Sequence, residues 1–189
     1  NYPVNFIGKC LRSKESKVIG HISIGMTDHP FFGKITEGID RIATDHGYNV
    51  IIGNTYGKAE LERKQIKMML DRMVDGIILS SPISKRNVEL LKKESVPTVM
   101  IERPILINGV DKVYIDNRSG VYKSVKYLID CGHKNIIYVG VDDKRKLEKE
   151  RLEGFKNAFK DLGIKYQDEN ILLTNDYLFN KGKELIKNY

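Results

Sequence analysis

Two hydrophobic periodicities alternate along most of this chain, and their alternation restricts the fold more than any other feature of the sequence. Short runs with apolar residues at consecutive positions predict strands that are buried on both faces of a parallel sheet. The stretches between them predict amphipathic helices, as in 32–46, where Ile35 and Ile39 lie on one face. The sequence therefore predicts a doubly wound α/β fold with mostly parallel sheets.

The alternation predicts the positions of the individual elements. The predicted strands are 18–25, 48–53, 75–80, 97–101, 112–115, 136–141 and 171–174. The predicted helices are 32–46, 59–73, 85–94, 118–131, 150–162 and 180–188. Gly47, Gly132 and Gly163 each follow a predicted helix, where glycine adopts at low cost the left-handed conformation that commonly ends a helix.

Composition places the chain among ordinary globular proteins. Its 189 residues are 41% hydrophobic, which suits one large α/β domain or two small ones. The apolar runs are too short to span a bilayer, and the first residues lack the apolar core of a secretory signal, so we expect a cytoplasmic protein. Cys10 and Cys131 show no CxxC spacing, and we expect neither a disulfide nor a zinc site from them.

The formal net charge of +7 raises the question of nucleic-acid binding, but most basic residues fall on predicted helix faces. Residues 1–17 differ, because Lys9, Arg12, Lys14 and Lys17 stand there against a single acidic residue. A short basic arm of this kind is typical of segments that contact phosphate backbones. A frayed terminus has the same composition, so both interpretations stay open.

The sequence lacks the motifs of common nucleotide-binding and hydrolytic enzymes. The run 53–59 resembles a phosphate-binding loop, but it has one spacer residue too few and Ala59 in place of the required hydroxyl residue. No GxGxxG follows the first predicted strand, the histidines show no metal-ligand spacing, and no serine lies in a nucleophile elbow. We therefore expect a binding protein with no cofactor, and not an enzyme.

A set of short motifs runs through the chain in a fixed order. The set consists of Val18–Gly20, Asp28–Phe32, Glu37–Ile39, His46–Tyr48, Val74–Leu79, Val96–Pro97, Ile115–Asn117, Gly132–His133 and Arg151–Phe155. In order and spacing this set resembles the lactose/galactose repressor (LacI/GalR) family of transcriptional regulators over the whole length of the chain. The resemblance implies a two-lobed core like that of a periplasmic sugar receptor, which binds an effector between its lobes and acts as a dimer on operator DNA.

The resemblance also implies a division into regions. Residues 1–17 correspond to the hinge segment that follows a helix-turn-helix absent from this chain, 18–134 to the first lobe, and 135–189 to an incomplete second lobe. The hinge residues expected at DNA are Asn5, Lys9, Leu11 and Arg12, with Leu11 as the wedge into the minor groove. Gly8 stands where the family has alanine, and we therefore expect a hinge that is disordered without DNA.

Five positions correspond to the family's effector pocket: Phe31, Phe32, Ser80, Asp116 and Arg151. An aromatic ring stacks on a sugar or a base, but core packing beneath the helix is an equal alternative for Phe32. For Asp116 we favour a cap of the following helix over a ligand contact. Arg151 is expected to donate hydrogen bonds to effector hydroxyls or carboxylates, the alternative being an exposed residue in the first helical turn.

The partners implied are a small-molecule effector, operator DNA and a second copy of the chain. The predicted loop 144–149 carries four cations, which favours either a solvated loop or an anionic effector such as a sugar phosphate in place of a neutral sugar. The methionines of helix 59–73 fit either a dimer contact or ordinary core. A sugar receptor without a role at DNA is the alternative function, and a doubly wound enzyme is a more distant one.

Overall fold

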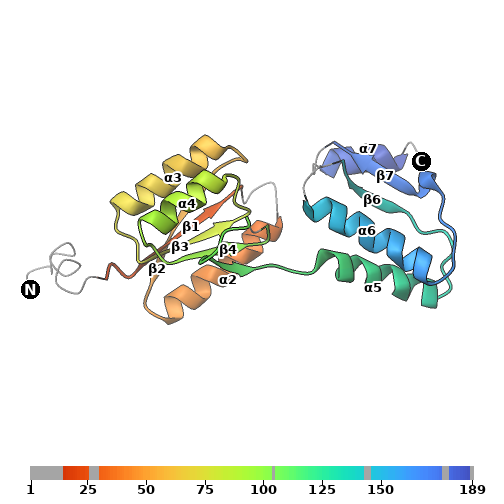
Figure 1. The fold of residues 1–189 in the computed structure, drawn as a ribbon, viewed down its shortest axis with the longest axis horizontal. Coiled ribbons are helices and arrows are strands. Elements are labelled where there is room, and N and C mark those ends of the chain that lie inside the picture. The colour runs from red at the N-terminus through yellow and green to blue at the C-terminus, as the bar shows by residue number, and fades with distance from the viewer. Residues whose placement is uncertain (1–14, 26–29, 104, 143–145, 176–178, 188–189) are drawn as a thin grey trace, which may run out of the picture. The chain divides into compact units, whose positions relative to one another are not determined.

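A computed structural model describes residues 15–25, 30–103, 105–142, 146–175 and 179–187. The chain forms two compact units that divide between Tyr114 and Ile115, and each unit is described by itself. Both are built from parallel strands connected by helices, which confirms the predicted fold class (Figure 1).

The first unit is a parallel sheet with the strand order β2-β1-β3-β4-β5. Its strands are β1 (Val18–Ser23), β2 (Asn49–Asn54), β3 (Gly76–Ser80), β4 (Thr98–Ile101) and β5 (Asp111–Val113). Its helices are α2 (Pro30–Asp45), α3 (Ala59–Asp71) and α4 (Lys85–Lys93). Helices α3 and α4 cover one face of this sheet, and α2 lies on the opposite face (Figure 1).

The apolar core of the first unit lies between the sheet and helices α3 and α4. Its buried members are Ile22, Ile66, Met69, Val74, Ile77, Leu79, Val88, Leu91, Met100 and Ile107. Met69 packs so tightly over β1 that a Cβ on Gly20 would lie 3.0 Å from its Sδ. Met69 is therefore core, whereas Met73 at the end of the predicted helix 59–73 is 59% exposed.

A buried carboxylate connects α3 to α4. Glu62 in the first turn of α3 is only 1% exposed. Its two oxygens accept hydrogen bonds from the backbone N–H groups of Ile83 (2.7 Å) and Ser84 (3.1 Å) and from Asn87 Nδ2 (2.9 Å). Helix α4 begins at Lys85, so Glu62 satisfies the two backbone donors that lie just before this helix and one side-chain amide of its first turn.

We expect Glu62→Ala to lower the free energy of unfolding by about 3 kcal/mol, because it leaves buried donors without an acceptor. Urea denaturation followed by circular dichroism measures this loss. Glu60→Ala, which removes an exposed carboxylate one half-turn earlier in the same helix, is the matched control and should change stability by less than about 0.5 kcal/mol. Equal losses in the two variants would contradict the role of Glu62 as the acceptor for these buried donors.

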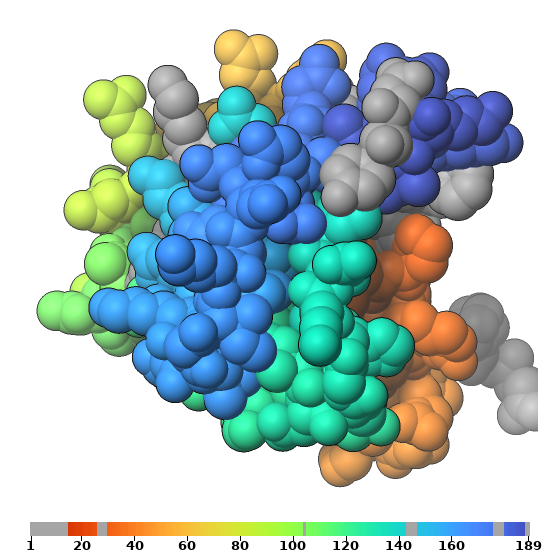
Figure 2. All heavy atoms as spheres, turned by 90° about the vertical axis from the view of Figure 1, so that its right-hand side faces the viewer, coloured from red at the N-terminus to blue at the C-terminus, as the bar shows by residue number. Residues whose placement is uncertain are grey.

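The second unit pairs β6 (Tyr138–Val141) with β7 (Ile171–Thr174) in parallel. Its helices are α5 (Asn117–Asp130), α6 (Lys146–Asp161) and α7 (Phe179–Lys187), with a short 3₁₀ helix, η1 (Asp168–Asn170), ahead of β7. Helices α5 and α6 lie side by side (Figures 1 and 2). The core beneath them is aromatic: the Phe155 ring lies 5.4 Å from Tyr138, 5.0 Å from Phe159 and 5.8 Å from Tyr166.

The predicted elements are all present, with differences at their ends. Gly47, Gly132 and Gly163 have φ values of 74°, 90° and 66°, which confirms their predicted left-handed conformation. Helix α6 begins at Lys146 instead of 150, because Leu147 and Glu148 are buried and extend the packed face of the helix. The prediction that 144–149 is a loop is thus wrong from Lys146 onward. The boundary between the units falls before the predicted lobe boundary at 134/135, since α5 packs on α6.

Candidate functional site

A buried polar network lies beneath α2, between the carboxyl ends of β1 and β3. His21 is fully buried, with its Nε2 2.8 Å from Ser80 Oγ and its Nδ1 3.3 Å from Thr36 Oγ1. Thr36, which is also buried, donates its hydroxyl proton to the carbonyl oxygen of Phe32 at 2.9 Å. The network thereby connects the predicted site residues Ser80 and Phe32 through His21 and Thr36, which belong to none of the predicted site positions.

Burial determines the charge of the histidine in this network. Desolvation lowers the pKa of His21 to about 4, because the interior disfavours the imidazolium form. The ring is therefore neutral near pH 7, with a proton on one nitrogen only. The sequence held one signal for this network. His21 and Ser23 are polar residues two positions apart in an otherwise apolar strand, so their side chains lie on the same face of the sheet.

Three polar atoms at the ends of β1 and β2 are buried but have no hydrogen-bond partner among the residues that the structure describes: Ser23 Oγ, Asn54 Oδ1 and Thr55 Oγ1. Ser23 and Asn54 are direct neighbours in the register of the two strands. Buried polar atoms cost free energy until water or a ligand satisfies them. Ligands of open parallel sheets bind outside the carboxyl ends of the strands, which is where these atoms gather.

The backbone at the same edge of the sheet is strained. Ser81 follows β3 with φ 59°, and Glu102 follows β4 with φ 73°, so two residues with a Cβ adopt the left-handed region. The Ser81 hydroxyl donates to the Glu102 carboxylate, and this bond holds the two loops together. Such conformations persist only where the surroundings enforce them, and they concentrate at functional sites.

The two phenylalanines at the start of α2 have different environments. Phe32 is 5% exposed and belongs to the interior, as the core interpretation predicted, whereas Phe31 is 52% exposed. Their rings meet edge to face with centroids 5.2 Å apart, so the buried ring supports the exposed one. Phe31 is consequently the aromatic side chain at this position that has a face available to a ligand.

In the second unit Asp116 caps helix α5. Its Oδ1 accepts from the backbone N–H of Ser119 (3.0 Å) and its Oδ2 from the Ser119 hydroxyl (2.7 Å). Both hydrogen bonds lower the pKa of the Asp116 carboxyl group, and the bond from the backbone N–H of Ser119 has the larger effect. The capping interpretation is confirmed, while a contact between Asp116 and a ligand remains a prediction.

Arg151 is held in place by two neighbours within the second unit. Its Nε donates to Asn117 Oδ1 at 3.0 Å, and its Nη1 donates to the buried Glu148 carboxylate at 2.7 Å. The side chain is 33% exposed. Because α6 begins at Lys146, Arg151 lies in the second turn, so the alternative of an exposed first-turn residue is wrong, while a contact with an effector stays a prediction. The structure thus brings Arg151 to the start of α5, beside the cap at Asp116.

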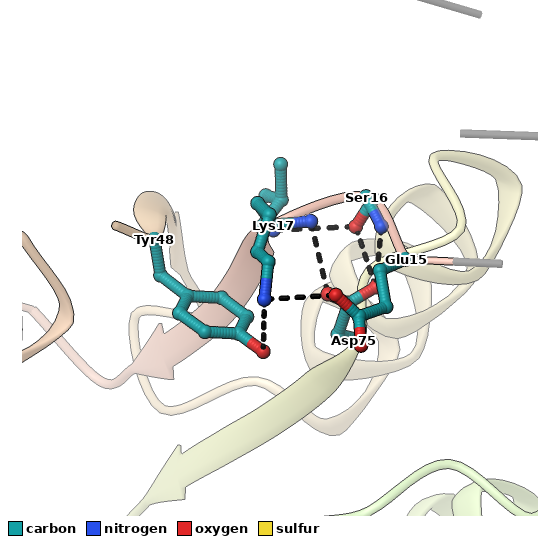
Figure 3. A network of polar contacts seen from close by, with 6 residues as sticks. Glu15, Ser16, Lys17, Tyr48 and Asp75 are labelled. Atoms are coloured by element: carbon teal, nitrogen blue, oxygen red, sulfur yellow. Dashed lines mark hydrogen bonds and ion pairs between the residues drawn. The ribbon is translucent and has the colours of Figure 1, made fainter. Parts of the chain in front are cut away.

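The chain enters β1 through a compact polar junction (Figure 3). Asp75 accepts hydrogen bonds from the Ser16 backbone N–H (2.7 Å), the Ser16 hydroxyl (2.9 Å) and the Lys17 backbone N–H (2.9 Å). Lys17 Nζ lies 2.8 Å from Glu15 and 4.6 Å from the centroid of the Tyr48 ring. The hydrogen bond to Glu15 raises the pKa of Lys17, and so does the hydrogen bond to the Tyr48 hydroxyl at 3.4 Å. Lys17 therefore belongs to this junction and not to a loose basic arm.

Several predicted positions lie outside the described residues. They are the hinge residues Asn5, Lys9, Leu11 and Arg12 and the cations of the predicted loop at 144 and 145. Among the residues that the structure does describe, no group of three or more His, Cys, Asp or Glu side chains is arranged to hold a metal ion. Within the same part of the chain, no helix is both long and apolar enough to cross a membrane.

Residues 16–189 match the protein family described as periplasmic binding proteins and sugar binding domain of LacI family. Catabolite control protein A of Priestia megaterium is 32% identical over 188 residues, which cover 98% of this chain and 56% of that protein. The transcriptional repressor PurR of Vibrio vulnificus is 29% identical over 177 residues, which cover 93% of this chain and 53% of that repressor. The chain spans about half the length of the curated relatives it matches.

Solved structures give the same result. The transcription regulator CcpA of Lactococcus lactis superposes with a TM-score of 0.75 at 29% identity, over 90% of this chain and 62% of that one. A transcription regulator from Lactobacillus plantarum superposes with a TM-score of 0.75 at 26% identity, over 89% of this chain and 60% of that one. Sequence and fold therefore lead to the same group of proteins.

Proposed function

This chain belongs to the family of periplasmic binding proteins and LacI-type sugar-binding domains, and from that premise we propose that it is the effector-binding and dimerising core of a DNA-binding transcriptional repressor. The relatives that support a role in transcription are named as control proteins and repressors. The observation that carries effector binding is the group of buried, unsatisfied polar atoms at the carboxyl edge of β1 and β2. Binding an effector and binding DNA require no catalytic side chain. Because the operator is part of the cell's DNA, this function implies a cytoplasmic protein.

We propose a neutral sugar as the effector class, in preference to a sugar phosphate. The guanidinium of Arg151 is already paired with the buried Glu148 carboxylate, so an incoming phosphate would compete with an internal anion. A sugar hydroxyl can instead accept from the same guanidinium without disturbing the pair. The exposed ring of Phe31 supports this class, because an aromatic face stacks on the apolar side of a sugar.

We propose that the effector regulates the protein by shifting the populations of two conformations of the core. An effector that binds one conformation of the core more tightly than another changes the operator affinity of the dimer, and by no more than its own difference in affinity. A sugar receptor without a role at DNA is the competing function. Salt-dependent binding of the complete protein to DNA would separate the two, because only the regulator neutralises phosphates when it binds.

We expect Arg151→Ala to weaken sugar binding by about thirtyfold, which corresponds to a charge-assisted hydrogen bond of about 2 kcal/mol. Isothermal titration of the complete protein with D-ribose, D-glucose and their phosphates measures the change. Lys149→Ala removes an exposed cation from the same helix and is the matched control, for which we expect wild-type affinity. Circular dichroism of both variants verifies the fold, because Arg151→Ala also leaves Glu148 without this partner.

Two results would overturn this proposal. The first is that none of the sugars or phosphates binds to the wild-type protein. The second is that a sugar binds with the same affinity to the wild type and to Arg151→Ala. A phosphate that bound more tightly than its parent sugar would instead favour the anionic effector.

A further inference from the structure

The direction of each hydrogen bond beneath α2 follows from counting protons. Thr36 has a single hydroxyl proton, and it donates this proton to the Phe32 carbonyl oxygen. No proton remains for the contact between Thr36 Oγ1 and His21 Nδ1 at 3.3 Å. The contact is favourable only if His21 Nδ1 carries the proton and Thr36 Oγ1 accepts it.

The state of the ring in turn determines the state of Ser80. His21 is neutral, so a proton on Nδ1 leaves Nε2 as an acceptor. The 2.8 Å contact between Nε2 and Ser80 Oγ must then be a hydrogen bond donated by the serine. The Ser80 hydroxyl proton is thereby committed to His21, and the oxygen of Ser80 offers only its lone pairs to any other group.

Ser80 has two polar neighbours at the ends of adjacent strands. Ile22 of β1 pairs with Leu79 of β3, so Ser23 and Ser80, one residue further along each strand, lie beside each other on one face. Ser23 also pairs with Asn54 of β2. Asn54, Ser23 and Ser80 consequently form a row across three neighbouring strands, which we call the polar row.

The polar row has a defined hydrogen-bonding capacity. Ser80 Oγ is an acceptor because of His21, and Asn54 Oδ1 is a buried acceptor without a partner among the described residues. Ser23 Oγ is equally buried and without a described partner, and its hydroxyl both donates and accepts. The row also has donors, namely the Ser23 hydroxyl and the N–H groups of the Asn54 amide. A ligand hydroxyl, which both donates and accepts, complements such a row, whereas a phosphate or carboxylate has no proton to donate to Ser80 Oγ and Asn54 Oδ1.

We propose that the polar row of Asn54, Ser23 and Ser80 is a ligand subsite that recognises hydrogen-bond donors of a neutral, hydroxyl-rich molecule, and that His21 is the positioning residue that sets the polarity of Ser80. This inference rests on the proposed function and deepens it. It assigns to the first unit a group of buried polar atoms that discriminates against anions, and it gives a reason for a histidine buried in a strand of the core.

The polarity can be tested without any ligand. We expect nitrogen NMR of His21 to show a protonated Nδ1 and an unprotonated Nε2 at pH 7. Thr36→Val keeps the shape of the side chain but removes the acceptor of Nδ1–H, so we expect it to shift the ring toward the other tautomer. Thr44→Val on the exposed face of the same helix is the matched control and should leave the tautomer unchanged. A wild-type ring protonated on Nε2 would overturn the assignment of Ser80 as an acceptor.

Ser23→Ala separates a ligand-binding role from a structural one. Removing a buried hydroxyl that has no partner should leave the melting temperature of the ligand-free protein unchanged or raise it. The same variant should weaken binding of D-glucose or D-ribose to the complete protein by about tenfold, as should Ser80→Ala. Wild-type affinity in Ser23→Ala, or tighter binding of the phosphorylated sugar than of the neutral sugar, would overturn the subsite.

The failure of this inference can be distinguished from the failure of the proposed function. If no sugar binds in any form, the proposed function fails, while the NMR experiment still decides the polarity of the row. If sugars bind and depend on Arg151 but not on Ser23 or Ser80, the proposed function stands and the polar row is not a subsite.

Discussion

Gly154→Ala is expected to destabilise the second unit by about 3 kcal/mol, although the same exchange in an open helix raises stability. A Cβ at Gly154 would overlap the carbonyl oxygen of Arg118 and would lie 3.1 Å from its carbonyl carbon and 3.2 Å from its Cα. These are backbone atoms of α5, which cannot rotate away as a side chain could. At Gly154, α6 thus lies too close to the backbone of α5 to admit a Cβ.

Gly120→Ala is the matched control for this experiment. Gly120 lies in α5, and a Cβ there would have no heavy atom within 4 Å. We therefore expect the control to gain about 0.5–1 kcal/mol from the better helix propensity of alanine. Thermal unfolding followed by circular dichroism measures both variants. Changes of the same sign in the two variants would contradict the close approach of α5 and α6.

Acid is expected to destabilise the first unit by about 3 kcal/mol through His21 alone, between pH 6.5 and pH 4. Burial lowers the pKa of the folded state from 6.5 to about 4. The unfolded chain therefore binds a proton as the pH falls below 6.5, while the folded protein does not. The stabilisation is complete above pH 6.5 and is lost progressively as the pH approaches 4.

His21→Gln measures this contribution, because glutamine keeps a polar side chain but does not titrate. Urea unfolding of the wild type and the variant at pH 7, 5.5 and 4.5 gives the free energy of unfolding at each pH. The difference between the two proteins in the slope of this free energy against pH is the contribution of His21. Carboxylates titrate in both proteins and cancel in the comparison. Parallel pH profiles would show that His21 is already protonated in the folded state or accessible to solvent.

Features that depend on neighbours in the chain were predictable. Each strand and helix follows from a periodicity within a few residues, and Gly47 ends its helix with the left-handed φ that its position indicated. Asp116 and Ser119 are separated by one helical turn, so the cap of α5 could be expected from local sequence. The family resemblance likewise rests on short local strings, and the family match confirms it.

Features that depend on distant residues were not predictable. His21 and Ser80 are 59 positions apart, and only the parallel register of β1 and β3 places them 2.8 Å from each other. The early start of α6 depends on the burial of Leu147, and the cations on both sides of this residue in the sequence gave no indication that it is buried. Arg151 was selected from its motif, but its pairing with Asn117, 34 positions away, required the packing of α6 on α5.

The sequence by itself determined the order of strands and helices, the parallel class of the fold and the family, because these depend on the hydrophobic pattern and on short motifs read along the chain. The tertiary structure alone decided which polar groups are buried, which of them have no partner within the described part of the chain, and which hydroxyl groups lie on either side of the His21 ring. The physical reason is that a hydrogen bond extends over about 3 Å. Its partners are defined only once the sheet register and the helix packing have brought remote residues within that distance.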